Sequence, residues 1–403
     1  MKMGGRSLLW VAPRWPVPAV DGARRATYNL LQELCRSGHQ VDLVALASAD
    51  QQVDLHAAAI DLGLRSARLL NIPTWATQSP SKWSLLCTAL RNPLTPASMK
   101  PYVVGQAMQT ILASGSWDAM VYDGLHAACH GLTGGRYKAP PLAPPVIYRA
   151  HNREAQSWQR SAFQASNPLV RWYLQWQAWV VRRFEDSLVR SALLAAVSQQ
   201  DLELFGPHAR GRVVPIGYEF EAPPTAPPSN CPQILFVGKL DWAPNHQGLR
   251  WFLQRVWPAV SSLRTDLELV VAGSGEPGDL LTLLRAAPHC RFIGCAERLD
   301  LLYRGAWLCL VPIFYGGGTR VKAIEAASFG RAVLSTKIGV EGLGLSSYLE
   351  AESEPQWIAQ LAQLEHTRAV QVGRAAHAEL SLRFCARAAA ASFESLLLEL
   401  PFP

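Results

Sequence analysis

Short apolar runs alternate with longer amphipathic segments along almost the whole of this 403-residue chain, and this alternation limits the fold more than any other feature. The runs predict strands at Leu8–Ala12, Gln40–Ala45, Ala119–Tyr122, Pro145–Tyr148, Leu193–Val197, Ile234–Val237, Leu267–Ala272, Cys290–Ile293, Leu308–Pro312 and Ala332–Ser335. Helices are predicted between them, at Ala23–Gly38, Gly248–Trp257, Leu280–Ala286, Leu299–Arg304 and Arg320–Phe329 among others. Buried strands that alternate with helices are typical of parallel sheets built from βαβ crossovers, so the predicted class is α/β.

A proline-rich segment at residues 222–232 divides this pattern. Its prolines cannot continue a helix or a central strand, so we expect a stiff linker. The prediction is an N-terminal Rossmann-like domain at 1–221, a second one at 233–383, and a C-terminal helix at 384–403 that packs back on the first domain. Ligands of such sheets bind beyond the carboxyl ends of the strands, so we expect the site in a cleft between two facing domains.

The charges fall unevenly on the two halves. Residues 1–232 hold 22 Lys and Arg against 15 Asp and Glu, whereas the rest of the chain holds 16 of each, so the first half carries the whole net charge of +7. A basic surface could meet an anionic membrane or an anionic substrate. The plain alternative is arginine-rich codon usage, since 31 of the 38 basic residues are Arg.

Several function classes are excluded by what the sequence lacks. No basic block, helix-turn-helix or zinc-finger pattern accompanies the charge, which argues against a nucleic-acid partner. There is no nicotinamide fingerprint, no P-loop and no nucleophile elbow. The eight cysteines show no paired spacing, which indicates a reducing compartment, and no apolar stretch suits a membrane span or a signal peptide. We therefore expect a cytoplasmic protein without a metal site.

The most informative segment for chemistry follows the predicted strand that ends at Pro312. It carries a turn of small residues and then a helix with two cations in its first turn, Arg320 and Lys322, and a carboxylate one turn later, Glu325. The turn consists of Gly316, Gly317, Gly318 and Thr319. Glycines let backbone N–H groups approach a ligand, and the helix N-terminus and the cations favour phosphate. A nucleoside diphosphate fits this set, with Glu325 on the ribose; an ordinary βα turn with a solvated basic face is the alternative.

The order of motifs along nearly the whole chain resembles the large family of retaining nucleotide-sugar glycosyltransferases that includes glycogen synthase-like enzymes (the group 1, or family four, type). The matching segments are Pro16–Val41, Ala150–Asn152, Val214–Gly217, Phe236–Lys239, Val271–Gly275, Gly316–Gly330 and Thr336–Leu343, and the "GGGTR-x-K" signature places the chain near one branch. The resemblance implies a GT-B fold and sugar transfer with retention, without a metal or other cofactor. Its substrates would be a nucleotide-diphosphate sugar and a saccharide or lipid-linked acceptor.

The resemblance also assigns roles to residues. It implies that His151 lies near the sugar and that Lys239 stands where the family has the arginine of its phosphate-binding pair. We expect Arg320 and Lys322 to compensate and to bind the donor phosphates beside the glycine amides. The sequence departs from the family where Gly317 replaces the first of two glutamates and Asn245 replaces a lysine. Gly22 is a further phosphate-side candidate. The weaker candidates are Arg24, Asp123, Asn152, Glu154, Asp241, Asn245, Gly273 and Glu341.

Each of these candidates has a structural alternative. His151 directly follows a predicted strand, where a capping or core histidine is also common, and Gly22 could be a simple turn glycine. Two other functions stay open: a GT-B sugar-nucleotide epimerase, and a catalytically silent GT-B partner subunit or sugar-binding module.

Residues 166–190 hold three tryptophans, Trp172, Trp176 and Trp179, at helical spacing on one face, together with Arg171, Arg182 and Arg183. We expect this helix to pack on its own sheet, with Phe184 and Leu188 continuing the buried face. The alternative is a helix at a membrane interface, through which the basic domain docks peripherally on an anionic membrane.

Overall fold

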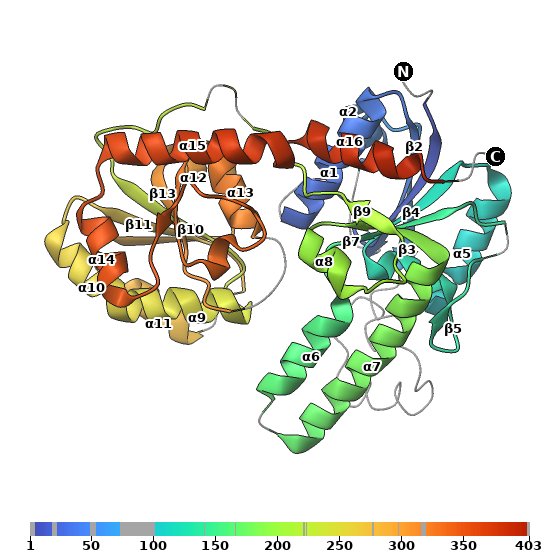
Figure 1. Ribbon diagram of the computed structural model, residues 1–403, viewed down its shortest axis with the longest axis horizontal. Helices are drawn as coiled ribbons and strands as arrows, with labels where there is room; N and C mark the ends of the chain where they lie inside the picture. The colour runs from blue at the N-terminus through green and yellow to red at the C-terminus, as the bar shows by residue number, and fades with distance from the viewer. Residues whose placement is uncertain are drawn as a thin grey trace. The chain divides into compact units, whose positions relative to one another are not determined.

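Two parallel sheets form the centres of two units of the chain in the computed structural model (Figure 1). The first unit comprises residues 1–215 and 389–403, and the second comprises residues 216–388. The structure describes residues 5–17, 22–48, 54–72, 101–140, 142–165, 167–220, 222, 224–275, 278–296, 298–315 and 320–400. The domain boundaries predicted from the sequence, after residues 221, 232 and 383, remain predictions.

The sheet of the first unit has seven parallel strands in the order β3-β2-β1-β4-β7-β8-β9. Their central members consist mostly of apolar residues with almost no solvent contact, as expected for parallel strands covered on both faces. The strands are β1 (Ser7–Ala12), β2 (Gln40–Ser48), β3 (Ser66–Ile72), β4 (Ala119–Asp123), β7 (Val146–Ala150), β8 (Ala192–Ala196) and β9 (Gly211–Val213), and a small antiparallel pair is formed by β5 (Leu132–Thr133) and β6 (Arg136–Tyr137).

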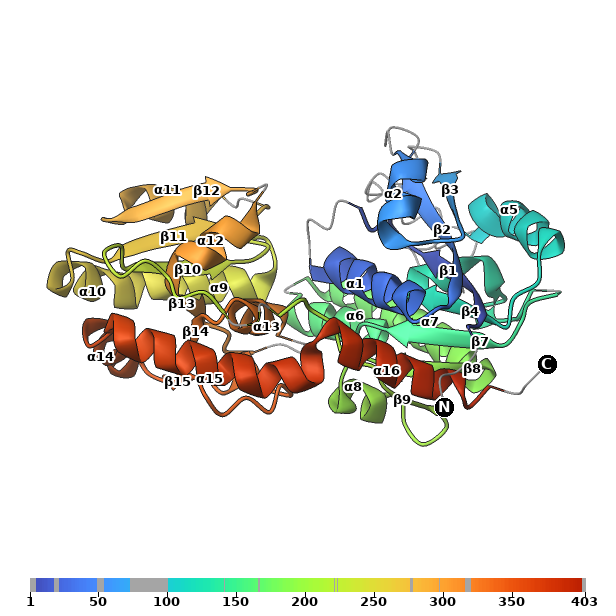
Figure 2. The same cartoon turned by 90° about the horizontal axis from the view of Figure 1, so that it is seen from above.

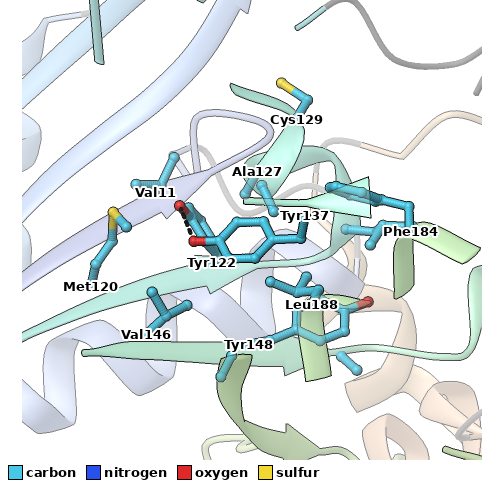
Figure 3. Packing of buried hydrophobic residues seen from close by; sticks show 14 of the residues in the cluster. Val11, Met120, Tyr122, Ala127, Cys129, Tyr137, Val146, Tyr148, Phe184 and Leu188 are labelled. Atoms are coloured by element: carbon cyan, nitrogen blue, oxygen red, sulfur yellow. Dashed lines mark hydrogen bonds between the residues drawn. The ribbon is translucent and has the colours of Figure 1, made fainter. Parts of the chain in front are cut away.

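Helices cover both faces of this sheet. Those on one face contribute to a core with Trp10 and Leu43, and those on the other to a core with Tyr122 and Tyr148, which Figure 3 shows. The first set is α1 (Gly22–Arg36), α2 (Leu55–Leu62) and α16 (Ala386–Leu397); the second is α5 (Pro101–Ser114), the 3₁₀ helix η1 (Leu125–Gly131) and α7 (Pro168–Ser191), with α8 (Gln199–Leu204) nearby. A further helix, α6 (Glu154–Gln164), packs antiparallel on α7, and the pair projects from the unit as a hairpin (Figure 1).

The C-terminal helix α16 completes the core of the first unit. Phe393, Leu396 and Leu397 are fully buried there, and the rings of Trp10 and Phe393 lie 5.5 Å apart. α1 and α16 lie side by side (Figure 2), and His39 Nε2 lies 3.4 Å from a Glu394 carboxylate oxygen. The last residues of the chain therefore supply part of the core of the first unit.

The second unit repeats the same strand order with six parallel strands, β12-β11-β10-β13-β14-β15. The strands are β10 (Gln233–Val237), β11 (Glu268–Ala272), β12 (Cys290–Gly294), β13 (Ala306–Val311), β14 (Ala332–Ser335) and β15 (Leu349–Glu350). One face carries α12 (Leu299–Gly305), α13 (Val321–Ser328) and α15 (His366–Phe384); the other carries α9 (Ala243–Trp251), a π-helical turn η2 (Phe252–Val256), α10 (Trp257–Leu263), α11 (Gly278–Ala286) and α14 (Glu354–Ala362). A 3₁₀ turn, η3 (Ile338–Val340), follows β14.

The predicted α/β class with two Rossmann-like halves is confirmed, and the predicted strands occur with ends shifted by one to a few residues. The helix predicted to begin at Gly248 begins instead at Ala243, because Pro244 occupies its first turn, where proline needs no N–H. The prediction that residues 166–190 pack on their sheet is correct for Phe184 and Leu188 and wrong for Trp172 and Trp179, which are 67% and 50% exposed. Among the described residues, no helix is long and apolar enough to cross a membrane.

Candidate active site

Both sheets reverse their strand order at one point, between β1 and β4 in the first unit and between β10 and β13 in the second. Open α/β sheets bind ligands beyond the carboxyl ends of the strands at this reversal, because the connecting loops diverge there. Each unit carries a cluster of polar side chains at this position. We call them the Asp123 cluster and the Lys322 cluster.

The Asp123 cluster is built around the last residue of β4. Asp123 is buried, and its Oδ1 accepts hydrogen bonds of 2.7 Å each from Arg149 and from His151 Nε2. Its Oδ2 accepts from Thr27 Oγ1 at 2.5 Å and from the indole N–H of Trp10 at 3.3 Å. Four elements, β1, α1, β4 and β7, thus converge on one carboxylate.

Arg149 favours the ionised form of this carboxylate. The guanidinium has no solvent contact, and its Nε and one terminal nitrogen have no hydrogen-bond partner among the described residues. Burial by itself would raise the pKa of Asp123, but Arg149, His151 and Thr27 together hold that pKa well below its usual range. Asp123 therefore accepts hydrogen bonds and does not donate them.

The fixed charge of Asp123 decides how His151 is presented. Because Asp123 is an acceptor, the proton on the shared hydrogen bond belongs to Nε2 of His151, and Nδ1 is the nitrogen left for a ligand. The His151 side chain is 27% exposed, whereas its partner is 2% exposed. A partly exposed imidazole oriented by a buried carboxylate is suited to contact a substrate and to stabilise positive charge.

The other N-terminal candidates lie around this cluster in different roles. Gly22 is the first residue of α1 and Arg24 lies in its first turn. Asn152 follows His151, and its buried Oδ1 has no partner among the described residues. Glu154 begins α6, where its backbone N–H donates to the buried carboxylate of Glu185 at 2.7 Å, so the position of Glu154 is fixed by a helix cap.

The Lys322 cluster stands at the equivalent place in the second unit. Lys322 Nζ donates to Asn245 Oδ1 at 2.6 Å and lies 4.2 Å from the centre of the Phe236 ring. Asn245 Nδ2 donates in turn to the backbone carbonyl of Lys239 at 2.9 Å. Burial, and to a smaller extent the neighbouring charge of Arg320, lower the pKa of Lys322 to about 7, although Glu325 acts in the opposite direction. An anion bound here would restore the positive charge.

Gly238 lets these side chains approach the end of β10. A Cβ atom at this residue would lie 2.6 Å from Asn245 Nδ2 and 3.2 Å from Lys322 Nζ. Gly273, at the end of the neighbouring β11, is equally constrained, because a Cβ there would lie 1.9 Å from the Gly238 carbonyl oxygen. The absence of a side chain at Gly238 and Gly273 therefore leaves room for the close packing around the Lys322 amine.

The remaining donor-side candidates are more scattered. Lys239 is exposed, and its Nζ lies 3.2 Å from Asp241, so it already has an anionic partner. Arg320 is buried, and its Nε–H donates to the Ile338 carbonyl at 2.9 Å. Glu341 is exposed and follows η3. Gly316, Gly317, Gly318 and Thr319 lie outside the described residues.

Glu325 lies in a buried position on α13. The hydroxyl of Tyr303 donates to Glu325 Oε2 at 3.0 Å. Burial, together with the nearby carboxylate, raises the pKa of Tyr303. The predicted contact of Glu325 with a ribose stays a prediction. Among the described residues no group of three His, Cys, Asp or Glu side chains is arranged to hold a metal ion.

The sequence reasoning missed four residues that organise these clusters: Trp10, Thr27, Arg149 and Tyr303. One of them, Arg149, could have been identified from the sequence. Arg149 interrupts the apolar run of β7, and a charged side chain inside a buried parallel strand requires a partner. Nothing in the sequence identified Asp123 as that partner.

With this geometry described, the relationship to known proteins can be stated. Residues 231–366 match the family described as "Glycosyl transferases group 1". A protein of Klebsiella pneumoniae, described as an uncharacterized 44.6 kDa protein in the cps region, is 34% identical over 122 residues. The similar segment spans 28% of this chain and 31% of that relative, so it leaves most of both chains unmatched.

Solved structures match the chain over its full length. HepE of Anabaena in complex with UDP and glucose is 13% identical, with a TM-score of 0.65 over 98% of this chain and 100% of the other. WaaG, described as a glycosyltransferase involved in lipopolysaccharide biosynthesis, is 15% identical, with a TM-score of 0.64 over 97% and 99%. TarM of S. aureus is 8% identical, with a TM-score of 0.67 over 97% and 99%. At such identities the likeness shows the fold, and the chain has the GT-B fold of these proteins.

Proposed function

We propose that this protein is a retaining glycosyltransferase of the hexosyl type that moves a sugar from a nucleotide-diphosphate sugar to a saccharide or lipid-linked acceptor. The observation that carries the proposal is the Lys322 cluster. It stands at the strand reversal of the second sheet, and it lies inside the segment that matches glycosyl transferases group 1. The complexes of HepE with UDP, glucose and UDP-glucose give the same expectation for the donor.

In this mechanism Lys322 and Arg320 stabilise the leaving diphosphate. A fixed cation placed where negative charge develops stabilises the transition state more than a mobile one, because no reorganisation is needed during the reaction. The pKa of Lys322 suits this role: the amine is held by Asn245 and is ready to take up a proton when an anion arrives. We expect Lys239 and the amides of Gly316–Gly318 to assist, and Glu325 to bind the ribose.

His151 is the group that we assign to the transferred sugar. Asp123 and Arg149 are positioning residues, since they act through the imidazole. Carbon–oxygen bond breaking at the sugar leaves positive charge on the anomeric carbon, and the anion of Asp123 behind the imidazole favours that charge. We propose that the reaction uses no metal, so that all charges on the diphosphate are met by the protein.

The test is a binding and turnover experiment with a panel of UDP-, GDP-, ADP- and dTDP-sugars. We expect at least one to bind and to be hydrolysed slowly without acceptor. Lys322→Met should weaken that binding at least tenfold, with Lys337→Met, on the exposed surface of the same unit, as the matched control. Unchanged affinity in Glu325→Ala would show the ribose assignment to be wrong.

One alternative function, a catalytically silent GT-B partner subunit, is favoured by a specific observation. Asn245 stands where the resembling family has lysine, which fits a catalytically silent GT-B partner subunit. Donor binding without transfer in any acceptor mixture would favour that alternative. The epimerase reading is not favoured, because the family that matches residues 231–366 is one of transferases.

We also propose a peripheral contact with an anionic membrane on the cytoplasmic side, made by the free end of the α6–α7 hairpin. Phe163, Leu169 and Trp172 are exposed there by 88%, 79% and 67%. Residues 155–175, which form this end, hold two arginines, Arg160 and Arg171, and no acidic residue. Arginines near an anionic bilayer contribute about 1 kcal/mol each, and tryptophan favours the interface.

Co-sedimentation with vesicles tests this contact. Binding to anionic vesicles, absent with neutral vesicles and weakened by Leu169→Ser with Trp172→Ser, is the expected result. Leu382→Ser, an exposed leucine of the second unit, is the control. Equal and negligible binding to both vesicle types would favour a soluble acceptor.

A further inference from the structure

A groove of about 570 Å³ runs along the C-terminal half of α7 and is lined by arginines. Its volume lies within the range of roughly 300–1,000 Å³ that is usual for ligand pockets. We call it the arginine groove. It is lined by Arg136 of β6, by Tyr137, and by Trp179, Arg182, Arg183, Asp186, Ser187, Arg190 and Ser191 of α7.

The arginine groove carries positive charge that the described part of the chain does not compensate. Its single acid, Asp186, accepts a hydrogen bond of 2.5 Å from Arg153, outside the groove, and lies 3.6 Å from Arg182. Arg136, Arg183 and Arg190 have no acidic partner among the described residues.

Some arginines elsewhere on the surface are paired, while others, such as Arg255 and Arg285, have no acidic partner among the described residues either. Arg264, Arg291 and Arg298 each lie within 3 Å of a carboxylate. Placing like charges together on one groove costs free energy unless an anion joins them. The gathering of Arg136, Arg183 and Arg190 in one groove therefore points to a bound anion.

The walls of the groove indicate what kind of anion fits. Trp179 is half exposed, and the Arg183 guanidinium lies 5.7 Å from the centre of its ring. An aromatic face beside hydrogen-bonding groups is a surface for a sugar ring, whose one side is apolar and whose edge is polar. Forked guanidiniums suit carboxylate, sulfate or phosphate groups on such a ring.

The far wall is rigid. The backbone N–H of Tyr137 donates to Ser187 Oγ at 2.5 Å, and the Tyr137 ring meets Phe184 edge to face with centroids 6.3 Å apart. The Tyr137 hydroxyl lies 3.2 Å from that of Tyr122 (Figure 3). Arg136 and α7 are therefore held at a fixed spacing, and a ligand need not order the wall when it binds.

We propose that the arginine groove binds an anionic saccharide, with acid groups on Arg136, Arg183 and Arg190 and a sugar ring against Trp179. No lining residue belongs to the Asp123 cluster, so this is a second site on the first unit. The identification of this saccharide as part of the acceptor rests on the proposed function. The proposal that the groove binds a saccharide is independent of that function. The site would hold a growing acidic chain while its end is elongated elsewhere.

The test is calorimetric titration of the full chain with three six-residue oligosaccharides: galacturonate, sulfated maltohexaose and neutral maltohexaose. At least one anionic probe should bind, more weakly as salt rises, and the neutral one at least tenfold more weakly than the anionic one. Arg136→Gln with Arg190→Gln should weaken anionic binding at least tenfold. Arg36→Gln, an exposed arginine paired with Glu33 in the same unit, is the matched control.

Two outcomes would overturn the proposal. One is that neither anionic probe binds, or that binding is unchanged in the double variant. The other is that the double variant loses binding to anionic vesicles while the oligosaccharides never bind, which would make the groove a lipid-headgroup site.

Trp179→Ala distinguishes a sugar from a bare anion, because it should weaken the binding of the oligosaccharides and leave the binding of inorganic pyrophosphate unaffected. If no nucleotide sugar binds, the proposed function is overturned, whereas the proposal that the arginine groove binds an anionic saccharide is unaffected.

Discussion

Asp123 and Arg149 form a pair in which each residue depends on the charge of the other. Replacing Asp123 by Asn removes the anion and leaves a guanidinium buried without a counter-charge. We expect the free energy of unfolding to fall by about 3–5 kcal/mol, measured by chemical denaturation. Asp123→Asn combined with Arg149→Met should recover stability and stay inactive, since His151 has lost its orienting carboxylate. If Asp123→Asn alone were as stable as the parent protein, Asp123 and Arg149 would not depend on each other's charge.

The pKa of Lys322 makes a second prediction at the scale of one residue. In the free protein the amine is largely neutral above pH 7, and a bound diphosphate favours its charged form, so binding takes up a proton between the free and the bound pKa. Affinity for a nucleotide sugar should therefore fall as pH rises from 7 to 9. Titration in two buffers of different ionisation enthalpy measures the proton uptake. Lys322→Met should abolish it, and a flat profile in the parent protein would exclude this role.

At the scale of elements, the turn after β10 determines how close the amine comes to the backbone. A methyl group in Gly238→Ala would push against Asn245 and displace Lys322. We expect nucleotide-sugar affinity to fall about tenfold, in line with the loss of one charged hydrogen bond. Gly278→Ala in α11 of the same unit is the control, because a Cβ atom there meets nothing within 4 Å. Equal affinities of the two variants would show that the spacing is unimportant.

The sequence predicted the elements better than the clusters they carry. Apolar runs located the strands because buried strands are mostly apolar. They missed β3 and β9, which form the edges of the sheet and include Arg68 and Arg212. His151 was predicted from its position after a strand. Its partners were not, because Thr27, Asp123 and Arg149 come from three separate segments, and local patterns contain no information about which strand ends meet. The exposure of Trp172 was missed because a helix face does not reveal whether a sheet lies under it.

At the scale of the whole molecule, α16 ties the end of the chain to its beginning. Phe393 is fully buried against Trp10, so Phe393→Ala should lower the free energy of unfolding of the first unit by about 3–5 kcal/mol. Leu398→Ala, an exposed leucine just after the same helix, should change it by less than about 0.5 kcal/mol. Thermal denaturation of both variants measures the difference. If they unfold alike, α16 is dispensable.

The return of α16 has a consequence for how the protein is made. In most multidomain chains the N-terminal part folds while the ribosome is still adding the rest. Here the apolar floor formed by Trp10, Leu30 and Leu34 lacks its cover until residues 386–400 have been translated. The nascent chain must carry an unfinished first unit through the synthesis of the entire second one, exposed to chaperones and proteases. A chain that stops before residue 386 would therefore leave the core of the first unit without its cover.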